Sequence, residues 1–226
     1  MGYCPRRVAI LLRNNVRIWY SETLMKPLGY RKAITDYIRV NAKPREKFSH
    51  QPRLYKLAVQ LAEERFFEDD VLFAAAWLHD LGVFVGHRPE NSSALSKWDN
   101  VGYALRKAPA LLKRFGFPMQ KVPAVLEAIR THQPSAKPTT FEGTLLRDAD
   151  ILEQLGAIAI LRTVCKIGRD TRFTVFEDAI GLLRKNLESL PKQLRLESAR
   201  RRAKPRVKVL KLFLDGALAE SNGFLA

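Results

Sequence analysis

The sequence predicts an all-α fold in a single domain. Apolar residues recur at helical spacing over most of the chain, as in Leu54, Leu57 and Leu61, which share one helix face. No segment shows the sustained alternation of apolar and polar residues that is typical of strands. The 226 residues, 46% of them hydrophobic, are enough to bury one core. The pattern indicates seven or eight helices.

The first 46 residues are expected to form a basic N-terminal extension, and residues 47–220 the helical domain. Within the extension the segment Val8–Tyr20 could form a helix. Pro27 and Pro44 interrupt the chain after it, because proline lacks the N–H that a helix interior requires.

The clearest helices begin at Ser49, which is a good N-cap residue. His50 lies one turn before Leu54 on the apolar face of the first of these helices. The second begins at Asp69 and runs through the sequence VLFAAAWLHD, which is apolar until its last two residues. A helix that is apolar on all sides is expected to be buried.

The remaining apolar patterns predict five further helices. Loops are expected around Gly82 and Gly86 and in the stretch SAKPTTFEG. Pro205 is expected to kink or interrupt the last helix. The five helices should lie at about 94–115, 122–132, 145–165, 173–187 and 197–218.

The chain is strongly basic, with 39 Lys and Arg against 23 Asp and Glu and a net charge of +16. This balance favours a polyanionic partner: a phosphorylated metabolite, a nucleic acid or an anionic membrane surface. The densest basic run, ESARRRAKPRVK, is interpreted as a solvated helix face; it could instead border a phosphate site or touch nucleic acid.

Two cysteines provide no disulfide framework, and no apolar segment is long enough to span a membrane. A cytoplasmic location is therefore expected, although the Arg-rich N-terminus leaves an organelle transit peptide open. The sequence does not indicate an oligomeric state.

Histidines and carboxylates lie in apolar surroundings, where a buried polar group without a partner costs about 1–3 kcal/mol. His79 and Asp80 end an apolar helix, and Asp148 and Asp150 interrupt another. Taken singly, each could be a buried ion pair, with Arg147 or Arg162 as the partner of the later aspartates. Together with His50 on a third apolar face, they favour a shared cation.

Three motifs resemble the HD-domain superfamily of metal-dependent phosphohydrolases. They are FSHQ at His50, AAAWLHDLG at His79-Asp80 and RDADILEQLGAIAI at Asp148 and Asp150, in the family order H, HD, D. The stretch PTTFEGTLLRDADILEQLGA is similar to small bacterial HD hydrolases with a "DADRL…LGAIG" helix. The resemblance covers residues 48–163 and continues more loosely through the C-terminal helices.

This resemblance implies an HD-type helical bundle in which His50, His79, Asp80 and Asp150 bind one divalent metal ion. Asp150 is preferred to Asp148 because it precedes an Ile-Leu pair, as the family's ligand precedes an "RL"-like pair. Asp148 would then orient a ligand or a water molecule. Periodicity leaves the choice between the two aspartates open.

Mixed nitrogen and oxygen ligands suit Mn²⁺ or Mg²⁺, and also Fe²⁺, Co²⁺ or Ni²⁺, better than a closed zinc site. The ion would activate a water molecule for attack on a phosphoryl group. Asp80 or Asp148 could take its proton, and His132 could donate a proton or bind phosphate, or simply cap its helix. The residues expected at the substrate are His87, Arg88 and Arg147.

The sequence departs from two patterns of the family. LGVFVG after Asp80 lacks the acid that some HD nucleotidases carry one turn after HD, which argues against a 5′-deoxynucleotidase. A second cluster of histidines and acids is also missing, so a mononuclear centre is expected.

The predicted function is hydrolysis of a phosphate ester or anhydride in a nucleotide or another small phosphorylated compound. One alternative is a non-catalytic, basic, nucleic-acid-binding or scaffold protein that retains the HD fold. The other is a helical protein with buried ion pairs and no metal.

Overall fold

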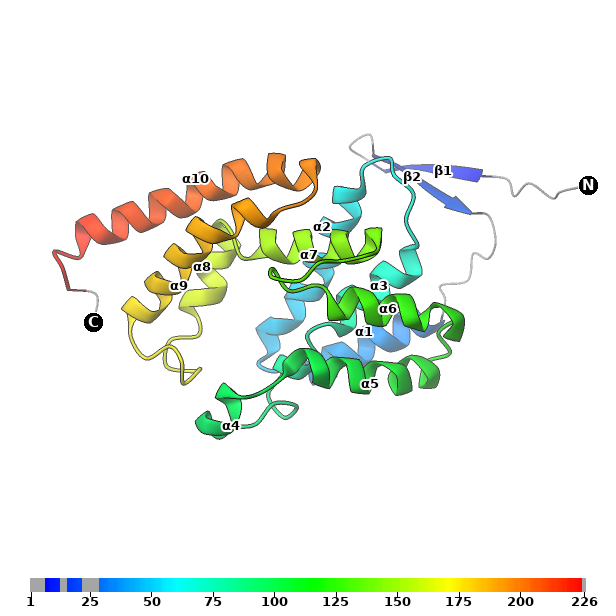
Figure 1. Cartoon of the computed structure of the whole chain (residues 1–226), viewed down its shortest axis with the longest axis horizontal. Helices are drawn as coiled ribbons and strands as arrows, with labels where there is room; N and C mark the ends of the chain where they lie inside the picture. Colours follow the sequence, from blue (N-terminus) through cyan, green and yellow to red (C-terminus); the bar gives the residue numbers. More distant parts are fainter. Residues whose placement is uncertain (1–6, 13–15, 22–28, 225–226) are drawn as a thin grey trace, which may run out of the picture.

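The computed structural model describes residues 7–12, 16–21 and 29–224, and its body is built from helices (Figure 1). Short 3₁₀ turns connect several of them: η1 at Arg45–Ser49, η2 at Leu81–Val83, η3 at Met119–Lys121 and η4 at Pro191–Gln193. The ten described α-helices are α1 Gly29–Asn41, α2 His50–Ala62, α3 Asp69–Leu78, α4 Ser92–Ser96, α5 Asn100–Arg114, α6 Val122–Arg130, α7 Phe141–Glu153, α8 Ala157–Val164, α9 Phe176–Ser189 and α10 Glu197–Glu220. The all-α prediction is confirmed for this body.

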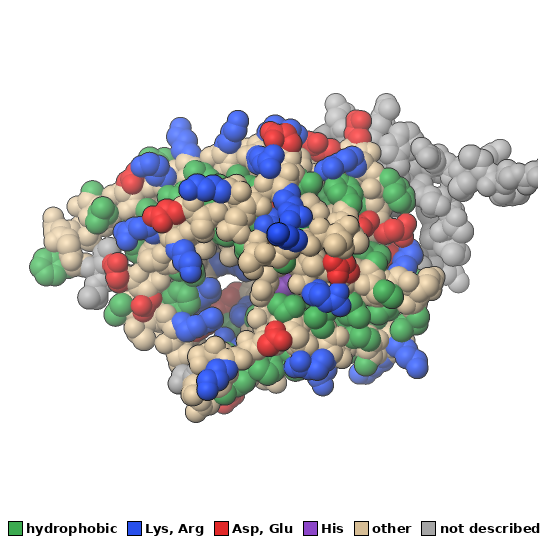
Figure 2. Space-filling model, in the orientation of Figure 1, with side chains coloured by type: hydrophobic (Ala, Val, Ile, Leu, Met, Phe, Trp, Pro, Cys, Tyr) green, Lys and Arg blue, Asp and Glu red, His purple; other side chains and the backbone are tan. Residues whose placement is uncertain are grey.

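Basic side chains are distributed over much of the surface, as Figure 2 shows for one face. In α10, Arg200, Arg201 and Arg202 are exposed, as expected for a solvated helix face. The helix continues through Pro205, so the predicted interruption is wrong. Within the described residues, no helix combines the length and apolar character that crossing a bilayer would need.

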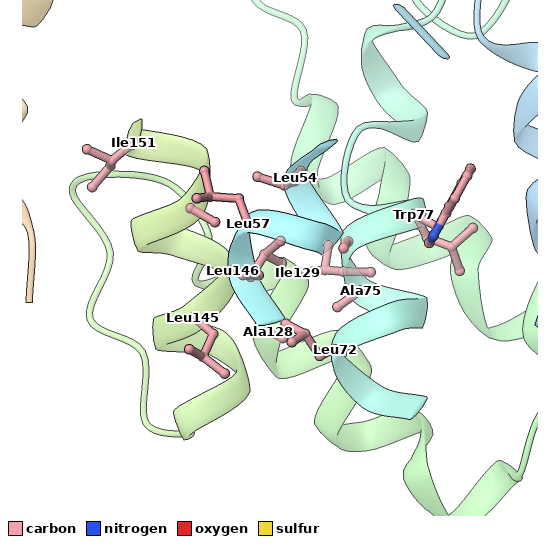
Figure 3. Close-up of a cluster of buried hydrophobic side chains, with 14 of the residues drawn as sticks. Leu54, Leu57, Leu72, Ala75, Trp77, Ala128, Ile129, Leu145, Leu146 and Ile151 are labelled. Carbon is pink, nitrogen blue, oxygen red and sulfur yellow. The ribbon is translucent and has the colours of Figure 1, made fainter. Parts of the chain in front are cut away.

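The centre of the core lies where α2, α3, α6 and α7 pack together (Figure 3). Every residue of α3 from Val71 to Leu78 is buried, as its apolar sequence predicts. Its three consecutive alanines are small, which lets neighbouring helices approach closely. Leu54 and Leu57 of α2 and Leu146 of α7 contribute larger side chains to the same core. This packing brings the ends of the four helices close together.

Helix α1 belongs to the same core, although the sequence pattern did not predict a helix there. Ile34 and Ile38 are fully buried, and α1 packs on α3. The hydroxyl of Tyr30 donates to Oδ1 of Asp70 at 2.5 Å. The segment expected as an extension therefore supplies part of the helical body.

The predicted helix at Val8–Tyr20 is wrong where the structure describes it. Strands β1 (Arg7–Leu12) and β2 (Val16–Ser21) pair antiparallel, with Ile10 opposite Ile18. Both are rich in β-branched and aromatic residues, which favour strands. In Figure 1 this hairpin lies at the edge of the helical body.

Two predicted long helices are each divided in two. The 94–115 helix is interrupted before Asp99, whose side chain accepts a hydrogen bond from the Gly102 amide at 2.8 Å and begins α5. The 145–165 helix is interrupted by Gly156, which has a φ of 80°, a value that favours glycine. Helix α7 also starts earlier, at Phe141, inside the expected loop.

Ser49 does not cap α2 as predicted. Its hydroxyl donates to the carbonyl of Glu46 at 2.8 Å, and no side-chain capping bond forms. The turn η1 leads directly into the helix instead, so that His50 is its first residue.

Candidate metal centre

The predicted site residues come from the ends of four helices. His50 begins α2, His79 and Asp80 follow α3, and His132 follows α6. Asp150 lies in the last turn of α7. Three of these ends are C-terminal, where unpaired carbonyl groups carry partial negative charge. The backbone itself therefore favours a cation at this place.

The side chains of His50, His79 and Asp80 converge. Each offers one ligand atom, and these atoms lie within 4.8 Å of one another, so the three residues could hold a metal ion. Nε2 of His50 lies 3.7 Å from Oδ2 of Asp80 and 3.5 Å from Oδ1 of Asp150. Nε2 of His79 lies 3.5 Å from Oδ1 of Asp80. Asp150 thus lies beside the trio.

Two imidazole nitrogens in this cluster are buried without a hydrogen-bond partner: Nε2 of His50 and Nε2 of His79. The Nδ1 atom of His79 donates to the carbonyl of Ala76 at 3.0 Å, which leaves the lone pair on Nε2. An unpartnered buried polar atom costs about 1–3 kcal/mol. A cation bound at these nitrogens would remove that cost, so the residues fit a metal ion.

The protonation states also suit a metal ion. Burial lowers the pKa of His50, although its hydrogen bond to Glu153 opposes the shift. Burial opposes ionisation of Asp80, but its electrostatic interactions with the neighbouring His79, His50 and His132 outweigh the effect of burial and hold the pKa of the carboxyl well below its usual range. Metal ligands are neutral imidazoles and ionised carboxylates, and His50 and Asp80 favour these forms.

His132 is buried and lies next to the cluster. Its ring centroid is 4.9 Å from that of His79, and its Nδ1 donates to the carbonyl of Ile129 at 2.6 Å. Burial, followed by the nearby His79, lowers the pKa of His132. Because Nδ1 carries the proton donated to Ile129, the lone pair of the ring lies on Nε2.

Glu153, which the sequence analysis missed, supports the cluster. Its Oε2 lies 3.3 Å from Nδ1 of His50, and it is 3% exposed. Arg53 donates to the same oxygen from Nε at 3.2 Å and from Nη2 at 3.1 Å, and Nη1 of Arg162 lies 3.5 Å away. Helical spacing could have revealed Glu153, because it lies three residues after Asp150 on one face of α7.

Asp148 lies in a different network, and the structure does not bring it into the cluster. Its carboxylate accepts hydrogen bonds from Arg147 at 2.9 Å and from the backbone amides of Arg195 and Leu196 at 2.8 and 2.7 Å. Residues two positions apart on a helix point about 200° apart. Asp150 therefore faces the cluster while Asp148 anchors the segment before α10, which is a structural role and not the predicted catalytic one.

Arg147, expected at the substrate, is also used inside the protein. It is 3% exposed, and besides its bond to Asp148 it donates to the carbonyls of Gln193 and Pro134. Its guanidinium group therefore joins α7 to the segments around it rather than facing the cluster.

His87 and Arg88 likewise have internal partners. Nδ1 of His87 lies 2.8 Å from the carbonyl of Leu81, and its Nε2 lies 3.3 Å from Oδ1 of Asn41. Arg88 pairs with Asp170 at 3.4 Å. These contacts fix the position of the segment that follows Asp80. Both residues therefore support the metal centre indirectly.

A cavity of about 540 Å³ opens onto the cluster. Asp80, His132 and Asp150 line it, and α9 contributes Lys185 and Asn186 from the facing side. In Figure 2 a hollow near the middle of the face shows acidic and histidine side chains at its back. The cavity would give a small polar molecule access to the cluster.

Comparisons with known proteins agree with this geometry. Residues 48–155 match the model of the HD domain. An HD-superfamily hydrolase from Bacillus thuringiensis has 22% identity and a TM-score of 0.59, with 86% of this chain and 97% of that chain covered. A predicted HD superfamily hydrolase from an uncultured Thermotogales bacterium has 26% identity and a TM-score of 0.57, with 84% and 91% covered.

Bacillus subtilis YpgQ in complex with ADP is similar in structure too. It has 21% identity and a TM-score of 0.66, with 88% of this chain and 98% of that chain covered. A comparison with curated proteins gave no match. The H, HD, D motifs lie within the matched residues, and their side chains meet in one cluster. Residues 48–155 therefore form an HD domain.

Proposed function

We propose that this protein is a metal-dependent phosphohydrolase that cleaves a phosphate ester or anhydride. The observation that carries the proposal is the pair of buried, unpartnered Nε2 atoms of His50 and His79 beside the carboxylate of Asp80. Asp150 completes a set of two nitrogen and two oxygen ligands around one divalent ion. Such a set suits Mn²⁺ or Mg²⁺ first.

The side chains around this site have different roles in the proposed reaction. A divalent ion held by His50, His79, Asp80 and Asp150 would lower the pKa of a water molecule toward neutrality and polarise a phosphoryl oxygen. Asp80, held ionised by its surroundings, orients the attacking water and can accept its proton. The Nε2 lone pair of His132 is a second proton acceptor at the cavity wall. Glu153 holds His50 so that Nε2 faces the cluster.

We propose a nucleotide or another small phosphorylated compound as the substrate. The cavity is large enough for a small molecule, and it presents polar side chains such as Gln133, Asn186 and Gln193. The similarity to YpgQ, solved with ADP, supports a nucleotide. The net charge of +16 would attract any of these anions.

The test is a screen of phosphate esters and anhydrides with Mn²⁺ or Mg²⁺ added, using the wild type and Asp80→Ala. Loss of a group that supports a metal ligand lowers activity by up to roughly 100-fold. Loss of the ligand Asp80 itself should lower the rate of phosphate release by more than that. Asp215→Ala, which removes an exposed carboxylate from α10, should match the wild type.

A folded wild type that binds no metal and releases no phosphate would contradict the proposal. It would favour a non-catalytic protein that retains the HD fold, and salt-dependent binding of DNA or RNA would then be the next measurement. Unfolding of Asp80→Ala would instead point to a structural role, which circular dichroism distinguishes.

A further inference from the structure

The two carboxylate oxygens of Asp150 contact different groups. Oδ1 lies 3.5 Å from Nε2 of His50. Oδ2 accepts a hydrogen bond from Nε2 of Gln154 at 3.1 Å, and the same amide nitrogen donates to the backbone carbonyl of Asp150 at 3.3 Å. Because both acceptors are oxygens without a proton to donate, the side chain of Gln154 must present its nitrogen to them. The hydrogen bond therefore engages one carboxylate oxygen and leaves the other facing His50.

The end of helix α7 places Gln154 at this position. Gln154 follows the last residue of the helix and lies four residues after Asp150. Side chains at this spacing are neighbours on a helix, and glutamine and aspartate form hydrogen bonds there. The backbone amide of Gln154 still donates to the carbonyl of Ile151 at 3.1 Å, so the residue is held before the chain turns away at Gly156.

The surroundings of this pair differ from those of an ordinary pair on a solvated helix surface. Gln154 and Asp150 both line the cavity at the metal centre, and the side chain of Asp150 is only 14% exposed. A hydrogen bond to an ionised group is roughly twice as strong as one between neutral groups, and partial burial strengthens it further. A carboxylate that lacks such a donor can offer one or both oxygens to a metal ion.

We infer that Gln154 is a positioning residue, which fixes the carboxylate of Asp150 so that Oδ1 alone binds the divalent ion. The inference rests on the proposed function, because the ion is the one that the proposed reaction requires. Groups that hydrogen-bond to a metal ligand orient it. Glu153 contacts His50 in a comparable way, so two successive residues of the chain each hold one ligand.

The first experiment titrates Mn²⁺ into the metal-free full chain by calorimetry. Gln154→Met keeps the length of the side chain and removes the amide, so it should weaken Mn²⁺ binding by about tenfold or more. Gln154→Ala, which removes the side chain beyond Cβ, should weaken binding at least as much.

The matched control is Gln60→Met, the same change at an exposed position on α2. It should alter Mn²⁺ affinity less than about twofold. Thermal unfolding of the metal-free variants shows whether each chain is folded. Wild-type Mn²⁺ affinity in both Gln154 variants would overturn the inference.

A double-mutant cycle tests whether Gln154 acts through Asp150. In an Asp150→Ala background the partner of Gln154 is gone, so adding Gln154→Met should change Mn²⁺ affinity less than about twofold. An equal loss of affinity in both backgrounds would mean that Gln154 acts on the ion by another route, and the positioning role would be wrong.

A spectroscopic measurement reports the coordination itself. The visible absorption of protein-bound Co²⁺ depends on the number and geometry of its ligands. In Gln154→Met saturated with Co²⁺, the spectrum should differ from that of the wild type, because the released carboxylate can offer its second oxygen. Gln60→Met should keep the wild-type spectrum. Identical spectra in the wild type and Gln154→Met would contradict binding through Oδ1 alone.

Gln154 lines the cavity, so the experiments also separate positioning from contact with the substrate. If Gln154→Met raises KM while Mn²⁺ affinity and the Co²⁺ spectrum stay unchanged, Gln154 binds the substrate and the inference is wrong.

The two proposals fail in different ways. An active enzyme whose Mn²⁺ affinity is independent of Gln154 retains the proposed function and loses this inference. A protein that releases no phosphate, but whose Mn²⁺ affinity depends on Gln154 through Asp150, retains the positioning role and loses the proposed function.

Discussion

Nδ1 of His50 and Oε2 of Glu153 lie 3.3 Å apart, joining the first residue of α2 to the last residue of α7. This contact orients the imidazole so that its Nε2 faces Asp150. Burial opposes ionisation of Glu153, but the contacts with His50 and Arg53 outweigh it and lower the pKa of the carboxyl to about 2. An ionised carboxylate behind a metal-binding histidine strengthens that histidine as a ligand.

Glu153→Gln should therefore weaken metal binding by about 10- to 100-fold while the fold is retained. The amide remains a hydrogen-bond partner but cannot stabilise the imidazole by charge. Titration of Mn²⁺ into the metal-free chain measures the change. Glu188→Gln, an exposed substitution on α9, is the control, and equal affinities in the two variants would refute the supporting role.

Asp150→Asn and Asp148→Asn should impair different properties, the first metal binding and the second stability. The Asp150 variant should lose metal affinity with little loss of stability, because this side chain faces the cavity. The Asp148 variant should unfold more easily by about 3 kcal/mol, since it leaves the buried guanidinium of Arg147 without its ion pair.

Chemical denaturation and Mn²⁺ titration of both variants test this pair of outcomes. If Asp148→Asn lost metal affinity while keeping wild-type stability, the assignment of Asp150 as the ligand would be reversed.

Gly82→Ala should disturb the segment that positions Asp80. A Cβ atom at Gly82 would lie 2.3 Å from the backbone carbonyl oxygen of Asn100 in α5, so the two segments would have to separate. The expected cost is about 1–3 kcal/mol in the free energy of unfolding, with weaker metal binding.

Gly181→Ala is the matched control for that substitution. This glycine lies in α9 with no atom within 4 Å of the added methyl group. Alanine there should be neutral or stabilise by up to about 1 kcal/mol. Thermal unfolding of both variants gives the comparison. Equal stability of the two variants would contradict the prediction, because it would mean that α5 moves to accommodate the methyl group with no loss of stability.

Asp70 should stabilise the fold in a pH-dependent manner. Burial opposes its ionisation, but hydrogen bonds from Tyr30, Arg31 and Lys121 outweigh this and lower the pKa to about 2. Because the folded pKa lies below the ordinary value, the stabilisation is complete above about pH 4 and is lost as the pH falls toward 2.

Asp70→Asn should therefore lower the free energy of unfolding by about 1–3 kcal/mol at pH 7. Its difference from the wild type should shrink between pH 4 and about 2. Denaturant titrations across this range measure the difference, with the exposed Asp215→Asn as the control. A difference that stays constant down to pH 2.5 would contradict the assigned hydrogen bonds.

The apolar periodicity of the sequence was sufficient for the helical class and for the helices that carry the motifs. Local pattern determines which face of a helix is buried, and α3 is apolar on every side, so its burial follows from its sequence alone. The H, HD, D order indicated the family because the residue types and their helical contexts are local features. Breaks such as the one at Gly156 were missed because an isolated glycine can also lie inside a helix.

What surrounds the metal centre depended on contacts between residues far apart in the chain. Glu153 reaches His50 across 103 positions, and Asp148 meets the backbone of Leu196 across 48, so neither partner can be read from spacing. Periodicity had left Asp148 and Asp150 equivalent; only the packing of α7 between α2 and the segment before α10 separates their faces. The sequence determined which ionisable and polar groups are available, and tertiary packing decided which of them share a site. The reason is that a buried charge is stable only when an opposite charge or a hydrogen-bond partner lies close to it in space.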